Sequence, residues 1–240
     1  MSRGIHRSSL SEQVTEGIMT LIKEAGLRSG DSLPPAGELA ETFDVSVPVV
    51  REAIAGLAAL GALRRQQGRE TVVSTPEASH LGRLLRFRVE TEEIDDQSIQ
   101  RFREVVEVGS AELAAQERDA AALGRLDVAL ARLRSARTEE QLHEADVAFH
   151  AAVARASGND LFVLTLEAME PLLHRLRSTV WRGWVASGGD LTSIVEAHTT
   201  ILDRIREGDG PGAAAAMHEH LLQARRGLHV QTGSLEVTPP

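Results

Sequence analysis

The stretch Val45-Ser46-Val47-Pro48-Val49-Val50-Arg51-Glu52-Ala53-Ile54 decides the fold of the N-terminal part of the chain. Ser46 is a good N-cap, and Pro48 is tolerated in the first turn because its missing N–H lies among the unpaired donors there. An apolar stripe at helical spacing follows, made of Val50, Ala53, Ile54 and Leu57. A second short helix is predicted just before it, over residues 38–43. Two short helices separated by a four-residue turn are typical of a helix-turn-helix.

The segments on either side extend this motif. Residues 10–25 carry Leu10, Val14, Ile18, Leu21 and Ile22 at helical spacing, and Gly26 follows as a C-cap residue. After Gly61, two β-prone arms surround Gln67-Gly68, and this pattern indicates a small hairpin that ends at Pro76. A helix, a helix-turn-helix and a hairpin in this order predict a winged helix-turn-helix domain.

Candidate DNA contacts lie on the predicted third helix and on the hairpin. Arg51 lies on the outward face near the start of that helix and has the side chain for a bidentate contact with guanine. Ser46 and the helix N-terminus suit a phosphate. On the hairpin, Arg64, Arg65 and Arg69 gather positive charge around Gly68, which has no side chain to keep its backbone from the groove. The alternative is that these surface arginines are solvated and bind nothing.

From Pro76 to about residue 230 the pattern is helix after helix, with breaks at 157–159, 187–189 and 208–211. The expected fold is therefore mainly α: a winged helix-turn-helix domain (1–78), an all-α helical bundle (79–232), and a flexible tail (233–240). The chain contains 0 Cys, so a metal in this protein has to be held by imidazole and oxygen ligands.

Three predicted helices of the bundle each aim such a ligand at the apolar core. Asp146 and His150 are four residues apart and so project from one face, one turn apart. His198 lies among Ile194, Ile201 and Leu202, and His220 lies among Met217, Leu221 and Ala224. Burying a carboxylate and three imidazoles is costly unless they are paired or bind a metal. Core histidines that are satisfied by neighbouring residues are the alternative interpretation.

The N-terminal residues resemble the winged helix-turn-helix of GntR-type bacterial regulators. The resemblance covers about residues 8–75 and rests on Gly30-Asp31-x-Leu33-Pro34-Pro35-x-x-Glu38-Leu39-Ala40, on Val45-Ser46 with Val50-Arg51-Glu52-Ala53-Ile54, and on Gln67-Gly68-Arg69. It implies binding to double-stranded operator DNA through seven residues: Ser46, Arg51, Arg64, Arg65, Gln67, Gly68 and Arg69. The family usually has arginine at Gly37 and a polar or basic residue at Val47, so Arg51 and the hairpin must read more of the operator here.

Residues 80–230 resemble the FCD effector domain of the FadR-like branch of that family, on Asp146-x-x-Phe149-His150 followed by Ala156-Ser157-Gly158-Asn159. The resemblance implies a divalent transition metal of the Zn, Ni, Fe or Mn type, held by Asp146, His150, His198 and His220. It also implies that Arg103 binds an anionic effector. From their spacing alone, Arg103 and Glu107 form an i, i+4 ion pair that is either solvated or structural.

The predicted function is that of a transcriptional regulator, expected to be a repressor. It is expected to be a homodimer that reads an inverted repeat, and a small organic acid at the metal-containing pocket is expected to control its affinity for the operator.

The net charge of −9 argues against a protein that coats DNA. Residues 1–80 carry 8 basic and 10 acidic residues, and the remainder carries 18 basic and 25 acidic residues. Most of the net negative charge therefore lies outside the predicted DNA-binding domain. The chain shows no apolar signal segment and no apolar run approaching ~18 residues, which predicts a cytoplasmic protein without membrane contact.

Two other functions fit parts of the pattern. A metal-dependent hydrolase could use the Asp/His set with Glu144 or Glu196 as base, but neither glutamate is on the predicted core face, so an enzyme is not expected. The second alternative is a transcriptional regulator whose helical domain only dimerises and whose buried histidines hold no metal.

Overall fold

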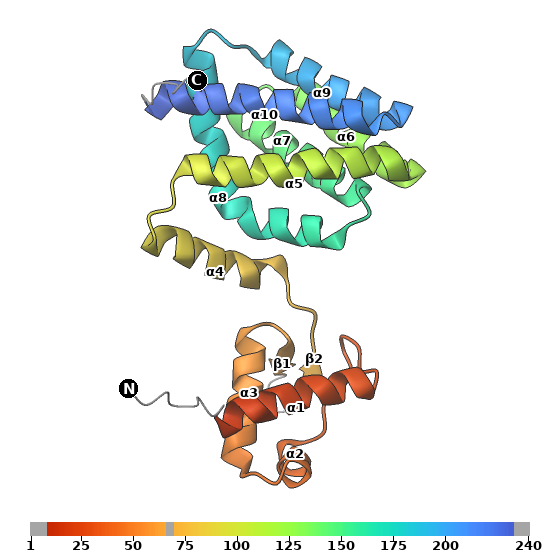
Figure 1. Cartoon of the computed structure of the whole chain (residues 1–240), viewed down its shortest axis with the longest axis vertical. Coiled ribbons are helices and arrows are strands. Elements are labelled where there is room, and N and C mark those ends of the chain that lie inside the picture. Colours follow the sequence, from red (N-terminus) through yellow and green to blue (C-terminus); the bar gives the residue numbers. More distant parts are fainter. Residues whose placement is uncertain (1–8, 66–69, 233–240) are drawn as a thin grey trace, which may run out of the picture. The chain divides into compact units, whose positions relative to one another are not determined.

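The computed structural model describes residues 9–65 and 70–232. The chain divides into two compact units, Met1–His80 and Leu81–Pro240, each of which is described by itself (Figure 1). The predicted contact residues Gln67, Gly68 and Arg69 and the predicted tail 233–240 lie outside the described residues. The mainly α fold is confirmed, and the described strands are confined to one small hairpin.

The N-terminal unit is a winged helix-turn-helix. Its elements are α1 (Leu10–Glu24), α2 (Ala36–Thr42), α3 (Val47–Ala59), β1 (Leu63–Arg65) and β2 (Thr71–Val73). The strands pair antiparallel, with Leu63 opposite Val73 and Arg65 opposite Thr71. Ile18, Leu39, Val50 and Leu57 are buried together and hold the three helices against one another. Leu10, expected on the apolar stripe of α1, is 58% exposed because it is the first residue of the helix.

Local sequence explains how α3 begins. Asp44 adopts a left-handed conformation (φ 50°) in the turn after α2 and so changes the chain direction. Ser46 is the N-cap with an extended backbone, and Pro48 lies in the first turn, as predicted. The Ser46 side chain makes no capping hydrogen bond, so its hydroxyl stays available at the exposed start of the helix.

The C-terminal unit is a bundle of long helices. They are α4 (Ala78–Thr91), which begins just before the unit, α5 (Asp96–Glu117), α6 (Ala120–Ser135), α7 (Glu139–Ala156), α8 (Asp160–Ala186), α9 (Leu191–Glu207) and α10 (Gly210–Thr232). Helix α10 packs against α5, α8 and α9, and α5 also contacts α7 (Figure 1). The predicted breaks are confirmed: Asn159 caps α8 through its side chain, and Gly208 ends α9 in a left-handed conformation.

The main core of this unit lies between α5, α6, α7, α9 and α10. Its largest fully buried side chains are Phe149, Leu126, Leu133, Ile201, Leu202, Ile205 and Met217. A second apolar cluster lies along α8, around Leu173 and Leu176. The predicted metal ligands lie beside this main core, on helices α7, α9 and α10, which set their positions.

Candidate metal centre

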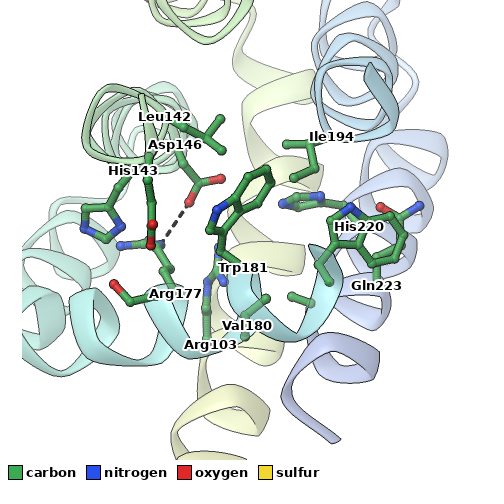
Figure 2. A pocket seen from close by; sticks show the side chains of 14 residues that line it. Arg103, Leu142, His143, Asp146, Arg177, Val180, Trp181, Ile194, His220 and Gln223 are labelled. Atoms are coloured by element: carbon green, nitrogen blue, oxygen red, sulfur yellow. Dashed lines mark ion pairs between the residues drawn. The ribbon is translucent and has the colours of Figure 1, made fainter. Parts of the chain in front are cut away.

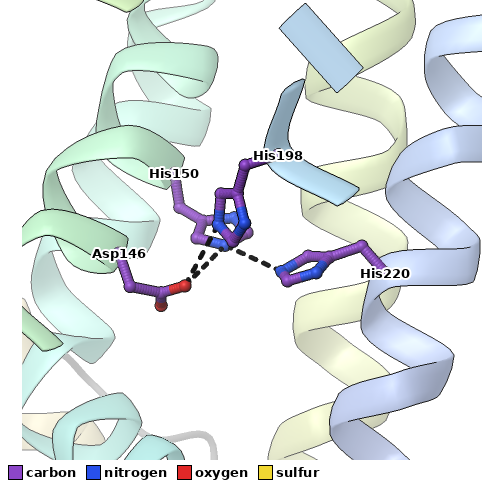
Figure 3. Close-up of side chains that lie close together, drawn as sticks. All are labelled: Asp146, His150, His198 and His220. Carbon is purple, nitrogen blue, oxygen red and sulfur yellow. Dashed lines mark hydrogen bonds and ion pairs between the residues drawn. The ribbon is translucent and has the colours of Figure 1, made fainter. Parts of the chain in front are cut away.

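The four predicted ligands come together from three helices. Asp146 and His150 lie on α7, His198 on α9 and His220 on α10, and one ligand atom from each lies within 4.8 Å of all the others (Figure 3). Nε2 of His198 is 3.2 Å and Nε2 of His150 is 3.5 Å from Oδ1 of Asp146. The Nε2 atoms of His220 and His150 are 3.3 Å apart. We call these four residues the Asp/His cluster.

These separations match those between ligands of a single ion. Ligand atoms about 2.1 Å from one metal lie roughly 3.0 Å apart at a right angle and roughly 3.4 Å apart at a tetrahedral angle. The three imidazoles are buried, with His198 0%, His150 2% and His220 7% exposed. The arrangement therefore has the spacing, the donor atoms and the seclusion that a divalent transition metal requires.

The partners of the imidazole Nδ1 atoms decide which nitrogen faces the centre. Nδ1 of His198 lies 2.8 Å from the carbonyl oxygen of Ile194, one turn earlier on α9. Nδ1 of His150 contacts the carboxylate of Glu107 on α5. In the His198 ring the Nδ1–H is then the donor, and in the His150 ring Nδ1 is turned to Glu107, so Nε2 of both rings faces the cluster, as in carboxylate–histidine–metal arrangements.

Sequence reasoning left the position of Glu107 open between a solvated and a structural ion pair. The structure shows a buried one: Arg103 is 2% and Glu107 1% exposed, and Nε of Arg103 lies 2.5 Å from Oε1 of Glu107. Glu107 thus contacts the cluster through His150, on the side of the ring opposite to Nε2. The signal that could have found it is its i, i+4 spacing from Arg103 on the face of α5 that also carries the buried Ser110, Ala111 and Ala114.

The sequence analysis did not identify Arg177 as a residue of this site. It lies on α8 and is 7% exposed, with Nε 3.0 Å from Oδ2 of Asp146 (Figure 2). Its Nη1 is 2.9 Å from Oε2 of Glu170. The spacing of Arg177 from the buried Leu173 and Leu176 puts it on the inner face of α8. Its partners come from a different helix and from a position two turns earlier on α8, which helical periodicity alone does not identify.

The charges within the cluster shift its titration. Burial acts to raise the pKa of Asp146, but His150, His198 and Arg177 hold it well below its usual range. Glu107 behaves in the same way: burial is opposed by Arg103 and His150, and its pKa is lowered. Burial, together with His198 and His150, lowers the pKa of His220 well below its usual value. Both carboxylates are therefore ionised and His220 is neutral at pH 7, the states in which they bind a metal. Burial acts to lower the pKa of His150, but Glu107 and Asp146 raise it, so a metal at this ring would displace a proton.

A cavity of about 80 Å³ opens beside the cluster (Figure 2). It has room for roughly five to eight water molecules, or an organic molecule of similar size. Its polar lining residues are Arg103, Glu139, His143, Asp146, Arg177, Ser178, His220 and Gln223, and its apolar ones are Leu142, Val180, Trp181, Trp184, Ile194 and Ala224. Two guanidinium groups and an apolar wall are suited to a small organic anion.

The remaining histidines and acids of these helices lie elsewhere. His143 turns away from the cluster, and its ring centroid is 4.0 Å from that of His174 on α8. His218 is exposed although it is only two residues from His220. Glu144 and Glu196, the two bases weighed for a hydrolase, are both exposed. Neither glutamate is therefore buried beside the Asp/His cluster.

The N-terminal unit exposes the described residues that were predicted to contact DNA. Ser46 and Arg51 are exposed at the start of α3, and Arg64 and Arg65 are exposed on β1. Val47, in contrast, is half-buried and packs against the core of the unit. The valine at this position therefore packs against the core, whereas the family usually has a polar or basic residue there that contacts DNA.

A winged helix-turn-helix unit followed by a separate helical unit with a buried polar cavity defines a class of two-domain DNA-binding regulators. Residues 10–73 match the family described as bacterial regulatory proteins, gntR family, and residues 98–223 match the FCD domain. The chain belongs to the GntR family of bacterial transcriptional regulators and carries an FCD domain as its C-terminal part.

Individual relatives agree with this assignment. The chain is 33% identical to the HTH-type transcriptional regulator LutR of Bacillus subtilis over 203 residues, which cover 84% of this chain and 93% of LutR. It is 27% identical to the HTH-type transcriptional repressor NanR of Escherichia coli, over 92% of this chain and 84% of NanR. Among solved structures, Streptococcus agalactiae GntR is similar with a TM-score of 0.71 and 27% identity, over 90% of this chain and 99% of that one. These relatives are transcription regulators and not enzymes, as expected for this chain.

No helix within the described part of the chain is both long and apolar enough to span a bilayer.

Proposed function

We propose that this protein is a metal-containing transcriptional repressor whose affinity for its operator is controlled by a small carboxylate. In this proposal residues 1–78 form the DNA-binding domain, residues 79–232 bind the effector and dimerise, and residues 233–240 are a tail. The observation that carries the proposal is the convergence of Asp146, His150, His198 and His220, together with a cavity that is lined by Asp146, His220 and two arginines.

A metal fits the donor set because the cluster leaves a buried nitrogen unsatisfied. Nε2 of His198 has no hydrogen-bond partner within the described residues, although it lies 3.2 Å from Oδ1 of Asp146. Since Nδ1 of the same ring contacts the carbonyl oxygen of Ile194, Nε2 is the ring nitrogen that points to Asp146 and is placed to bind a metal. A divalent ion held by the four residues would give this nitrogen a partner, and it would supply a Lewis acid to which an anion can bind.

The two arginines provide the charge that a carboxylate requires. Nη2 of Arg103 lies 3.1 Å from Nε2 of His150, the atom that would face the metal. When His150 gives that lone pair to a metal, Nη2 of Arg103 loses its acceptor and is free for an oxygen of the effector. Arg177 reaches the same cavity from α8. The cavity size and the apolar side chains opposite favour a carboxylate with a short apolar body.

A homodimer is part of the proposal because exposed apolar side chains gather on the C-terminal unit. Val105 is 76% and Phe102 41% exposed on α5, and Phe87 is 68% and Leu84 59% exposed on α4. Exposed apolar groups of this size on neighbouring turns are typical of an interface. A two-fold dimer would present two copies of α3 to the two halves of an inverted repeat.

Operator binding with and without metal and effector tests this function. The affinity of the full-length protein for DNA from upstream of its own gene is measured by fluorescence anisotropy, first with Zn²⁺ and then after chelation. A panel of two- to four-carbon monocarboxylates, including 2-hydroxy and 2-oxo acids, is then added. We expect at least one of them to weaken operator binding by about tenfold or more, because typical coupling energies are 1–3 kcal/mol.

The control is Arg103→Gln, which removes the charge and shortens the side chain but keeps a hydrogen-bonding amide; it should bind the operator and lose the response. If no carboxylate changes the affinity of the metal-loaded protein, the effector assignment is wrong. If chelation changes neither the thermal stability nor operator binding, the buried histidines hold no metal and the helical domain is a structural dimeriser.

A further inference from the structure

A second group of metal-binding residue types lies outside the Asp/His cluster, across the groove between α7 and α8. Glu139 and His143 are an i, i+4 pair on α7, and Glu170 and His174 are an i, i+4 pair on α8. Residues at this spacing project from one face of a helix, so each pair presents a carboxylate and an imidazole side by side. All four line one open cavity of about 670 Å³. We call them the outer set.

The two pairs face each other. The ring centroids of His143 and His174 are 4.0 Å apart at an interplanar angle of 52°, and Nε2 of His143 is 4.0 Å from Oε1 of Glu170. Nη1 of Arg177 holds the other oxygen of Glu170 at 2.9 Å, so that Oε1 is the oxygen aimed at His143. The outer set is looser than the Asp/His cluster, and its members Glu139 and His174 are exposed, so their side chains can change rotamer to approach an ion.

The surroundings favour a cation. The cavity is lined by Glu139, Glu140, Glu144 and Glu170, while Lys and Arg are absent from its described lining. Arg177 balances Glu170 from outside this lining, and the three other carboxylates create a negative potential that concentrates divalent ions. Imidazole nitrogens and carboxylate oxygens at such a place are ligands for Zn²⁺ and similar ions.

We propose that Glu139, His143, Glu170 and His174 form a second, solvent-accessible site for a divalent transition metal. The site lies at the mouth of the inner cavity, because the two cavities share Glu139, His143 and Ser178. It binds more weakly than the Asp/His cluster, since its ligands are exposed and less preorganised. An ion at this site can exchange with solvent.

Competition titration of the untagged full-length protein tests the second site. Metal-free protein is titrated with Zn²⁺ against a chromophoric chelator, and bound metal is counted independently by equilibrium dialysis. We expect two equivalents per chain, one tight and one weaker. His174→Ala and His143→Ala should each lose the weaker equivalent and retain the tight one. His218→Ala, which removes an exposed histidine from α10, should retain both.

The two sites are separable in the same assay. His220→Ala should lose the tight equivalent and keep the weaker one, so the outer site stands even if the buried centre does not. The proposal is overturned if His174→Ala binds the same two equivalents as His218→Ala, or if the wild type binds a single equivalent that only His220→Ala removes. Circular dichroism of each variant confirms that the helical content is unchanged.

Discussion

Nδ1 of His198 lies 2.8 Å from the carbonyl oxygen of Ile194, one turn earlier on the same helix. This contact uses the ring's donor on the backbone and turns Nε2 toward Asp146, 3.2 Å away. A local feature of α9 thus selects the tautomer with which His198 can bind a metal. The Asp/His cluster is preorganised on this side without any contribution from a distant residue.

The first prediction concerns the metal content of protein purified without added metal. His198→Ala and His220→Ala should each lose most of the bound metal, because each removes one of four ligands from the buried centre. His218→Ala is the matched control, since it removes an exposed histidine from the same helix as His220. Elemental analysis of the three variants and the wild type measures the difference. Equal metal content in all four proteins would contradict the assignment of the ligands.

The second prediction concerns Glu107, which contacts Nδ1 of His150. Glu107→Gln keeps the shape of the side chain but weakens its hold on the imidazole. We expect the metal affinity to fall by about 10- to 100-fold, the usual effect of losing such an outer partner. A chelator competition assay measures this. Glu104→Gln, one turn earlier on α5, should leave the affinity unchanged because Glu104 does not contact the cluster and pairs instead with Arg225 at 3.5 Å.

The third prediction separates sequence reading from general DNA attraction. Arg51→Ala on α3 should cost about 1–3 kcal/mol with the operator and leave binding to unrelated DNA almost unchanged. Arg64→Ala on β1 should weaken binding to both DNAs by a similar factor and reduce the slope of log K against log salt by about one. Anisotropy titrations at three salt concentrations distinguish the two effects. If Arg51→Ala binds the operator as tightly as the wild type, α3 does not read the bases through Arg51.

The fourth prediction concerns the crossing of α8 and α10. A Cβ at Gly183 would lie 1.8 Å from the carbonyl oxygen of Gly227, so Gly183→Ala must push the two helix backbones apart. We expect a loss of about 1–3 kcal/mol in the free energy of unfolding, as for other overpacked sites. Gly124→Ala on α6 is the control: nothing lies within 4 Å of the new methyl group, and the helix should gain about 0.5–1 kcal/mol. Urea unfolding followed by circular dichroism measures both changes.

The fifth prediction concerns acid stability of the chelated protein. The pKa of Glu107 is lowered in the folded protein because Arg103 and His150 outweigh the effect of burial. A carboxyl group of this kind stabilises the fold above its unfolded pKa of about 4, and the stabilisation is lost as the pH falls from there toward the folded value. The urea midpoint of the C-terminal unit should therefore fall steeply below pH 4. In Glu107→Gln the fall should be shallower, and an identical fall would contradict this role of Glu107.

Local sequence signals were sufficient for much of the fold. The N-cap Ser46, Pro48 in the first turn and the stripe of Val50, Ile54 and Leu57 predict α3, and the structure confirms it. The breaks at Gly158, Gly188 and Gly208 are also confirmed, because glycine adopts positive φ at the ends of helices with little strain. Ser46 occupies the N-cap position as predicted, but its side chain makes no capping hydrogen bond.

The candidate site was predictable in part for the same reason. Asp146 and His150 are four residues apart, so helical geometry alone places them on one face of α7. The apolar neighbours of His198 and His220 indicated that these residues point inward. The contacts of Arg177 with Asp146 and of Glu107 with His150 were not predictable, because each contact joins two different helices.

The sequence by itself determined the class of protein, the helices, and which polar side chains face the core, because capping, periodicity and turn chemistry act over a few residues. Only the tertiary structure decided that three helices meet with their ligand atoms within 4.8 Å of one another, that Arg103 and Arg177 line the same cavity, and that His143 pairs with His174 instead of joining the Asp/His cluster. These relationships depend on how the helices pack, and the close approach of α8 and α10 at Gly183 and Gly227 is one place where that packing is set.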